Sequence, residues 1–200
     1  MAKLDLYKLH KSDYVAPLKP VLVDIKPARY LSITGQGEPG GSTFQARLGA
    51  LYNTAFTIKM AKKFARQDYA VCKLEGLWWG NNKASRFLEE PRDCWNWKLL
   101  IRSPDFIQNR DVTEAARNLI GKGKSADVSE VKLETLREGR CVQVLHTGPY
   151  DQESATIEVM EKFAAEAGLA LHGLHHEIYL SDPRRVDVAR LKTILRYQAR

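Results

Sequence analysis

The stretches PARYLSITGQG at residues 27–37 and EGRCVQVLHTG at residues 138–148 resemble each other and decide the fold class. Each alternates apolar and polar residues and ends at a glycine, a pattern typical of a half-buried strand that leads into a turn. The turn glycines are Gly37 and Gly148. Because the pattern occurs twice, it predicts a duplicated unit.

A helix and two further strands are predicted after each of these stretches. Apolar residues recur every three or four positions over residues 42–66 and 151–168, which indicates one-sided helices. Strand patterns follow at 68–79 and 94–101 in the first half, and at 171–180 and 190–197 in the second. We therefore predict an α+β fold of two strand-helix-strand-strand repeats. Their antiparallel sheets join about a pseudo-twofold axis, with a ligand cleft between the halves and the helices on the opposite face.

The repeats also set the predicted domain boundaries. Residues 1–120 comprise the first repeat with an N-terminal extension and a connecting helix. Residues 121–128, rich in Gly, Ser and Lys, form the linker, and residues 129–200 form the second repeat. The two repeats are expected to make one compact domain, which suits a chain of 200 residues.

Composition narrows the range of partners and locations. Hydrophobic residues make up 44% and charged residues 28%, a balance that favours a folded core over disorder. No apolar run approaches the roughly 20 residues that cross a bilayer, and the start lacks the apolar centre of a signal peptide, so we expect a cytoplasmic protein without a membrane partner. The net charge is +7, but the basic residues are dispersed among acids, which argues against nucleic acid. The three cysteines match no disulfide or CxxC spacing.

Strand alternation separates the candidate site residues by face. In the stretch 171–180, His175, Glu177 and Tyr179 share one face, while the apolar residues share the other. If the apolar face meets the helix, Glu177 and Tyr179 look into the cleft. A buried carboxylate is costly without a partner, so a pocket carboxylate is one interpretation of Glu177 and a solvated strand glutamate is the other.

The same sorting in the first repeat places Glu75 and Trp79 toward the cleft and Trp78 toward the helix. Aromatic side chains near these positions can supply flat walls for a planar or cationic ligand. The candidates for these walls are Trp79, Trp95, Trp97 and Tyr150.

No metal site and no cofactor are predicted. His175 and His176 are adjacent, so on a strand they point to opposite faces and cannot both hold one ion. Adding His146 and His172 produces no recognised ligand spacing. His175 is either a proton relay beside Glu177 or an ordinary histidine.

Several longer motifs carry a family resemblance: LEGLWWG, DCWNWKLLI, CVQVLHTGPYD, ATIEVMEKF and HHEIYLSDPRR with LKTILR. Over nearly its whole length, the chain resembles stand-alone GyrI-like small-molecule-binding proteins. The resemblance implies a tandem strand-helix-strand-strand fold, shared with effector-binding domains in which a central acidic residue meets cationic aromatic drugs. It places that acidic position at Glu177, with Tyr179 beside it, and the tryptophan walls at Trp78 and Trp79.

The resemblance also implies an activity, because some stand-alone members hydrolyse cyclopropane-bearing genotoxins. We therefore expect a cofactor-independent hydrolase in which Glu177 activates water and Tyr179 donates a proton to the developing oxyanion. The alternative is a multidrug-binding, sequestering or effector-sensing module that uses the same pocket without turnover. Both need a carboxylate between aromatic walls, so the sequence does not separate them, and it names no protein partner.

Overall fold

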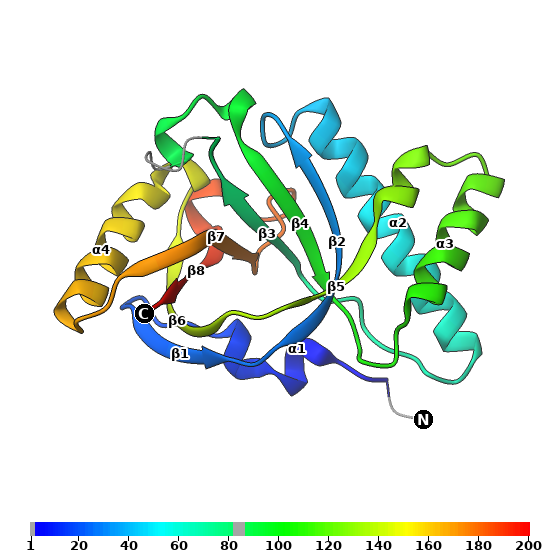
Figure 1. Cartoon of the computed structure of the whole chain (residues 1–200), viewed down its shortest axis with the longest axis horizontal. Helices are drawn as coiled ribbons and strands as arrows, with labels where there is room; N and C mark the ends of the chain where they lie inside the picture. The colour runs from blue at the N-terminus through cyan, green and yellow to red at the C-terminus, as the bar shows by residue number, and fades with distance from the viewer. Residues whose placement is uncertain (1–2, 82–86) are drawn as a thin grey trace.

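The computed structural model describes residues 3–81 and 87–200. These residues form one eight-stranded antiparallel sheet with strand order β1-β6-β8-β7-β3-β4-β2-β5 (Figure 1). The strands are β1 (Val21–Ile25), β2 (Ala28–Gln36), β3 (Leu74–Trp79), β4 (Asn96–Arg102), β5 (Lys132–Leu136), β6 (Gly139–Thr147), β7 (Leu171–Tyr179) and β8 (Lys192–Ala199). The helices are α1 (Leu6–Leu9), α2 (Ser42–Phe64), α3 (Asn109–Gly121) and α4 (Glu153–Glu166). The predicted α+β class is confirmed.

The two repeats meet in the middle of the sheet, where β3 pairs with β7. The first repeat contributes β2, α2, β3 and β4, and the second contributes β6, α4, β7 and β8, so each has the predicted strand-helix-strand-strand order. Each repeat also has a leading strand that the sequence patterns did not predict. β1 pairs with β6 of the second repeat, and β5 pairs with β2 of the first. The repeats thus exchange edge strands.

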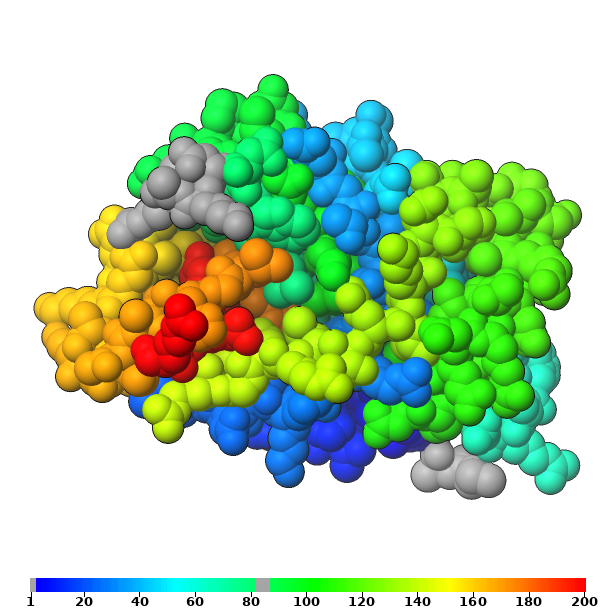
Figure 2. Space-filling view, in the orientation of Figure 1, coloured from blue at the N-terminus to red at the C-terminus, as the bar shows by residue number. Residues whose placement is uncertain are grey.

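This exchange brings the N-terminal segment against the second repeat. In the space-filling view the N-terminal residues, in blue, lie along one edge of the molecule beside the yellow-green stretch that contains β5 and β6 (Figure 2). The backbone N–H of Leu145 donates to the Pro17 carbonyl at 2.8 Å. Tyr14 and Ala16 pack on Ile178 and Ile194, so this segment covers part of one sheet face.

Helices α2 and α4 cover the other face, each over its own repeat. Leu51, Ala55 and Ile58 of α2 pack on a core that includes Ile33 and Leu99. In the second repeat, α4 buries Ile157, Met160 and Ala164 against Val142, Val144 and Leu195. Because α2 packs on β2 and β4 and α4 packs on β6, the central strands β3 and β7 lie between the two helices.

Glycines allow two of the turns and one close contact. Gly37 and Gly148 both have positive φ, at 115° and 132°, which confirms their place in turns that other residues enter with strain. Gly35 lies under the Trp97 ring, where an added Cβ would be 2.2 Å from a ring carbon. Among the described residues, no helix is both long enough and apolar enough to span a membrane.

Candidate functional site

Glu177 lies at the junction of the two repeats, in a row of residues that runs straight across the sheet. The strand register aligns Ile33, Leu99, Gly76, Glu177, Leu195 and Val144. Directly opposite residues of antiparallel strands point to the same face, so Glu177 shares the helix-covered face with these apolar side chains. The expectation that the helices lie opposite the site is therefore wrong. Glu177 is only 7% exposed, in a position where a carboxylate needs polar partners.

Tyr179 is one neighbour of Glu177 and is held by Trp78. The Trp78 Nε1–H donates to the Tyr179 hydroxyl at 3.1 Å. This hydrogen bond needs a glycine at position 76, because an added Cβ would lie 2.8 Å from Trp78 Nε1 and 3.0 Å from the Tyr179 hydroxyl. Burial and the nearby Glu177 carboxylate raise the pKa of Tyr179 well above its ordinary value. The phenol therefore keeps its proton at neutral pH.

Aromatic rings surround this pair. Trp78 stacks on Phe44 of α2 with ring centroids 6.0 Å apart, and the edge-on ring of Trp95 packs against it at 6.0 Å. Tyr150 contacts Tyr179 edge-on at 5.8 Å and is itself 37% exposed. Burial and the Glu177 charge raise the pKa of Tyr150 to about 12. Tyr150 is thus the most exposed ring of this group.

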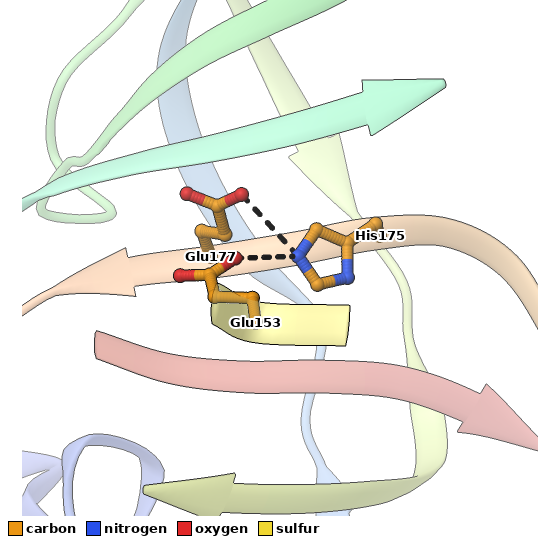
Figure 3. A group of neighbouring side chains, drawn as sticks. All are labelled: Glu153, His175 and Glu177. Carbon is orange, nitrogen blue, oxygen red and sulfur yellow. Dashed lines mark ion pairs between the residues drawn. The ribbon is translucent and has the colours of Figure 1, made fainter. Parts of the chain in front are cut away.

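Two further polar side chains, those of His175 and Glu153, lie close to Glu177 (Figure 3). His175 Nε2 lies 3.3 Å from Glu177 Oε1 and 3.5 Å from Glu153 Oε2. Glu153 lies in the first turn of α4, where a negative charge is favoured by the helix dipole, and it is buried. Asp151 lies in the 3₁₀ turn Tyr150–Gln152, which precedes α4.

The two carboxylates and the imidazole shift each other's protonation. Burial raises the pKa of Glu153, and the adjacent Glu177 carboxylate raises it further. Burial alone would lower the pKa of His175, but Glu153 and Glu177 outweigh it and raise the pKa to about 9. The buried cluster therefore holds protons at neutral pH, which reduces its net charge.

Glu75 and Trp79 lie on the opposite face of the sheet from Glu177, so the predicted grouping of these residues is wrong. The β3–β7 register pairs Glu177 with Gly76, and it pairs Trp78 with His175. The error has a physical cause. The error lies in β7, because Trp78 of β3 does face α2 as predicted. Ile178 of β7 packs against the N-terminal segment and not against a helix, so the apolar face of β7 did not indicate where the helices lie.

Glu75 belongs to a separate buried network on that opposite face. It accepts from the Tyr14 hydroxyl at 3.0 Å and contacts His176 Nε2 at 3.0 Å. The other ring nitrogen of His176 contacts Glu138 at 2.8 Å, and Arg196 donates to Glu138 at 2.9 Å. These contacts join the N-terminal segment to both repeats, which is a structural role.

Trp95 and Trp97 lie on the Glu177 face but deeper than predicted. Trp97 is fully buried, and its Nε1–H donates to the Gly37 carbonyl at 3.1 Å. Trp95 is 8% exposed and donates to the Glu90 carbonyl at 2.9 Å. Trp95 packs against Trp78, and Trp97 packs against Phe44. Direct contact of Trp95 or Trp97 with a ligand stays a prediction.

The sequence patterns missed Glu153 and Phe44. Glu153 was read as part of an amphipathic helix, and a helical glutamate carries no signal of a distant strand partner. A hollow of about 360 Å³ lies away from the site, between α3 and the 3₁₀ helix Ala126–Glu130. No carboxylate or histidine is among the lining residues of this hollow.

Comparisons with known proteins identify the family and the fold. The profile of the GyrI-like small molecule binding domain matches residues 18–198. An uncharacterized conserved protein from Listeria innocua is 35% identical, with a TM-score of 0.92 over 99% of this chain and 100% of its own. Two structures described as hydrolases from the same organism are each 34% identical. The first has a TM-score of 0.88 over 99% of this chain, and the second has a TM-score of 0.90 over 100% of it. The match covers 100% of each hydrolase chain. No match was found among curated proteins.

Proposed function

The chain belongs to the GyrI-like small molecule binding domain family, and on this basis we propose that it binds planar aromatic molecules beside Glu177 and hydrolyses cyclopropane-containing genotoxins. One observation carries the proposal. A nearly buried carboxylate lies at the junction of the repeats, between a protonated tyrosine and an acid-imidazole pair. Two relatives that are 34% identical over their full length are described as hydrolases.

Binding draws on the aromatic side chains around the carboxylate. The half-exposed Tyr150 ring and the adjacent Tyr179 ring offer flat surfaces for a planar ligand, and the buried Trp78 holds Tyr179 in place. Glu177 adds a negative charge in a poorly hydrated place, where attraction to a ligand cation is stronger than in water. Planar cationic compounds therefore fit the site as ligands.

The proposed reaction is the addition of water to a strained ring conjugated with a carbonyl. Glu177 accepts a proton from a water whose oxygen forms a bond to the cyclopropane carbon. The ring C–C bond breaks, and its electron pair moves through the conjugated system to the carbonyl oxygen. Tyr179 donates a hydrogen bond to this carbonyl oxygen. The oxygen then takes up a proton and becomes the hydroxyl of a phenol, so the net change is the addition of one water molecule.

Tyr179 suits the donor role because its hydroxyl already accepts from Trp78 Nε1–H. That bond orients the oxygen and leaves its own proton to donate. The raised pKa keeps the phenol protonated across the physiological range. Removing one such donor typically costs about 10² to 10³ in kcat.

The proposal is tested by incubating the purified protein with a spirocyclopropane dienone and following the ring-opened product by mass spectrometry. Glu177→Gln keeps the shape of the side chain and removes the base, so turnover should fall by about 10² to 10⁴ while binding is nearly kept. Glu158→Gln on the exposed side of α4 is the control and should be as active as the unmodified protein. Unchanged turnover in Glu177→Gln contradicts the assigned base.

The same experiment distinguishes a binding module from an enzyme. A protein that only binds or sequesters shows ligand affinity without ring-opened product. In that case Glu177→Gln should weaken cationic ligands and spare neutral ones of the same shape, because only the charge is lost.

A further inference from the structure

The adjacent histidines His175 and His176 each lie between two glutamates, but the two arrangements differ. His176 uses one ring nitrogen for each carboxylate, with Nε2 at 3.0 Å from Glu75 and Nδ1 at 2.8 Å from Glu138. Each contact has the length of an ordinary hydrogen bond. His176 is therefore a fully paired histidine and serves as an internal reference.

At His175 both carboxylates face the same ring nitrogen. Nε2 is 3.3 Å from Glu177 Oε1 and 3.5 Å from Glu153 Oε2, and an imidazole nitrogen carries at most one proton. It cannot donate to both carboxylates. Within the part of the chain that the structure describes, neither ring nitrogen of His175 nor Glu153 Oε1 has a hydrogen-bond partner, although these atoms are buried. Unpaired buried polar atoms of this kind are rare in folded proteins.

We propose that Glu153, His175 and Glu177 form a binding site for a divalent transition-metal ion. Each residue offers one donor atom, and these three atoms lie within 4.8 Å of one another. Figure 3 shows the three side chains grouped around His175. Zinc bonds of about 2.0 to 2.2 Å place two ligands of a tetrahedron about 3.3 to 3.6 Å apart. The two spacings at Nε2, 3.3 and 3.5 Å, match this range, and all three donor atoms lie within 4.8 Å of one another, so rotation of a carboxylate can complete the ligand set.

The donor set indicates the class of ion. Two carboxylates balance a charge of +2 within a buried cluster, and one imidazole with carboxylate oxygens suits Zn²⁺ or Mn²⁺. Mg²⁺ and Ca²⁺ prefer oxygen ligands alone. The sequence patterns missed this site because the third ligand comes from α4 and not from the neighbouring histidine.

An ion at this site is coordinated by Glu177, which is also the base of the proposed hydrolysis. Coordination takes electron density from the carboxylate and reduces its ability to accept a proton. We therefore expect bound Zn²⁺ to lower turnover. This last expectation rests on the proposed function, whereas metal binding itself does not and is measured without substrate.

The test uses the full chain, treated with chelator and then dialysed separately against Zn²⁺, Mn²⁺ and Mg²⁺. Elemental analysis should find one tightly held Zn²⁺ per chain and no retained Mg²⁺. His175→Gln and Glu153→Gln should each lose the ion, because each removes a ligand. The matched controls are His172→Gln on the same strand and Glu158→Gln on the same helix, which should keep it.

Substitution with Co²⁺ provides a readout that does not depend on the variants. Visible bands typical of nitrogen and oxygen ligands support the site, whereas a thiolate charge-transfer band assigns the metal to cysteine and overturns the proposal. Absence of retained Zn²⁺ in the folded protein, or equal retention in His175→Gln and Glu153→Gln, also overturns it. If circular dichroism shows that one variant is unfolded, the other variant and the Co²⁺ spectrum decide the outcome.

Discussion

Gly76→Ala tests the architecture of the site through one methyl group. The new Cβ would lie 2.8 Å from Trp78 Nε1, 3.0 Å from the Tyr179 hydroxyl and 3.3 Å from Trp78 Cε2. Trp78 cannot retreat easily because Phe44 and Trp95 pack against its ring. The substitution should therefore push Tyr179 away and break its hydrogen bond with Trp78.

The expected loss of stability has two parts. Overpacking of a core by a methyl group costs about 1 to 3 kcal/mol, and loss of a hydrogen bond costs about 1 kcal/mol more. For a chain of this size, about 1 kcal/mol corresponds to about 2 to 4 °C in Tm. Gly76→Ala should therefore lower Tm by about 5 to 15 °C.

Thermal unfolding followed by circular dichroism measures this effect, and ligand binding or turnover measures the displacement of Tyr179. The control is Gly49→Ala within α2, where an added Cβ meets nothing within 4 Å. Alanine favours a helix over glycine by up to about 1 kcal/mol, so the control should be neutral or slightly stabilised. If Gly76→Ala matches the parent protein in both Tm and ligand binding, the assigned contact between Trp78 and Tyr179 is wrong.

Three further outcomes are expected. Trp78→Phe should weaken planar ligands by about 1 to 3 kcal/mol in titrations, whereas Trp79→Ala, on the opposite sheet face, should leave their affinity unchanged and affect only Tm. Gly35→Ala should lower Tm more than Gly76→Ala, because its Cβ overlaps the buried Trp97 ring. Burial lowers the pKa of His176, but Glu138 and Glu75 raise it to about 9. Because the folded state raises this pKa, protonated His176 stabilises the folded protein by about 1 to 3 kcal/mol. This contribution is complete below about pH 6.5 and is lost as the pH rises through about 9. Urea titrations across this range should show the decline, and His176→Gln should reduce it.

The sequence by itself determined the strand-helix-strand-strand elements of each repeat, though not β1 and β5, and it determined which residues of a strand share a face. Alternation and the turn glycines located β2 and β6, and their repetition identified the duplication. The placement of His175, Glu177 and Tyr179 on one face of β7 was also correct, because side chains alternate along any strand. Local periodicity is enough for these features, since each depends on residues close together in the chain.

Only the tertiary structure decided which face of each strand meets the helices and which distant residues lie beside Glu177. Alternation cannot say whether Glu75 or Gly76 pairs with Glu177, because a shift of one residue in register turns every side chain of β3 to the other face. The exchange of β1 and β5 between repeats likewise depends on pairing between residues a hundred or more positions apart in the chain. Glu153 reaches His175 only because α4 packs over β6 and brings its first turn to the junction. Register and helix packing are set by the whole folded chain, and for that reason the candidate metal site was not visible in the order of its residues.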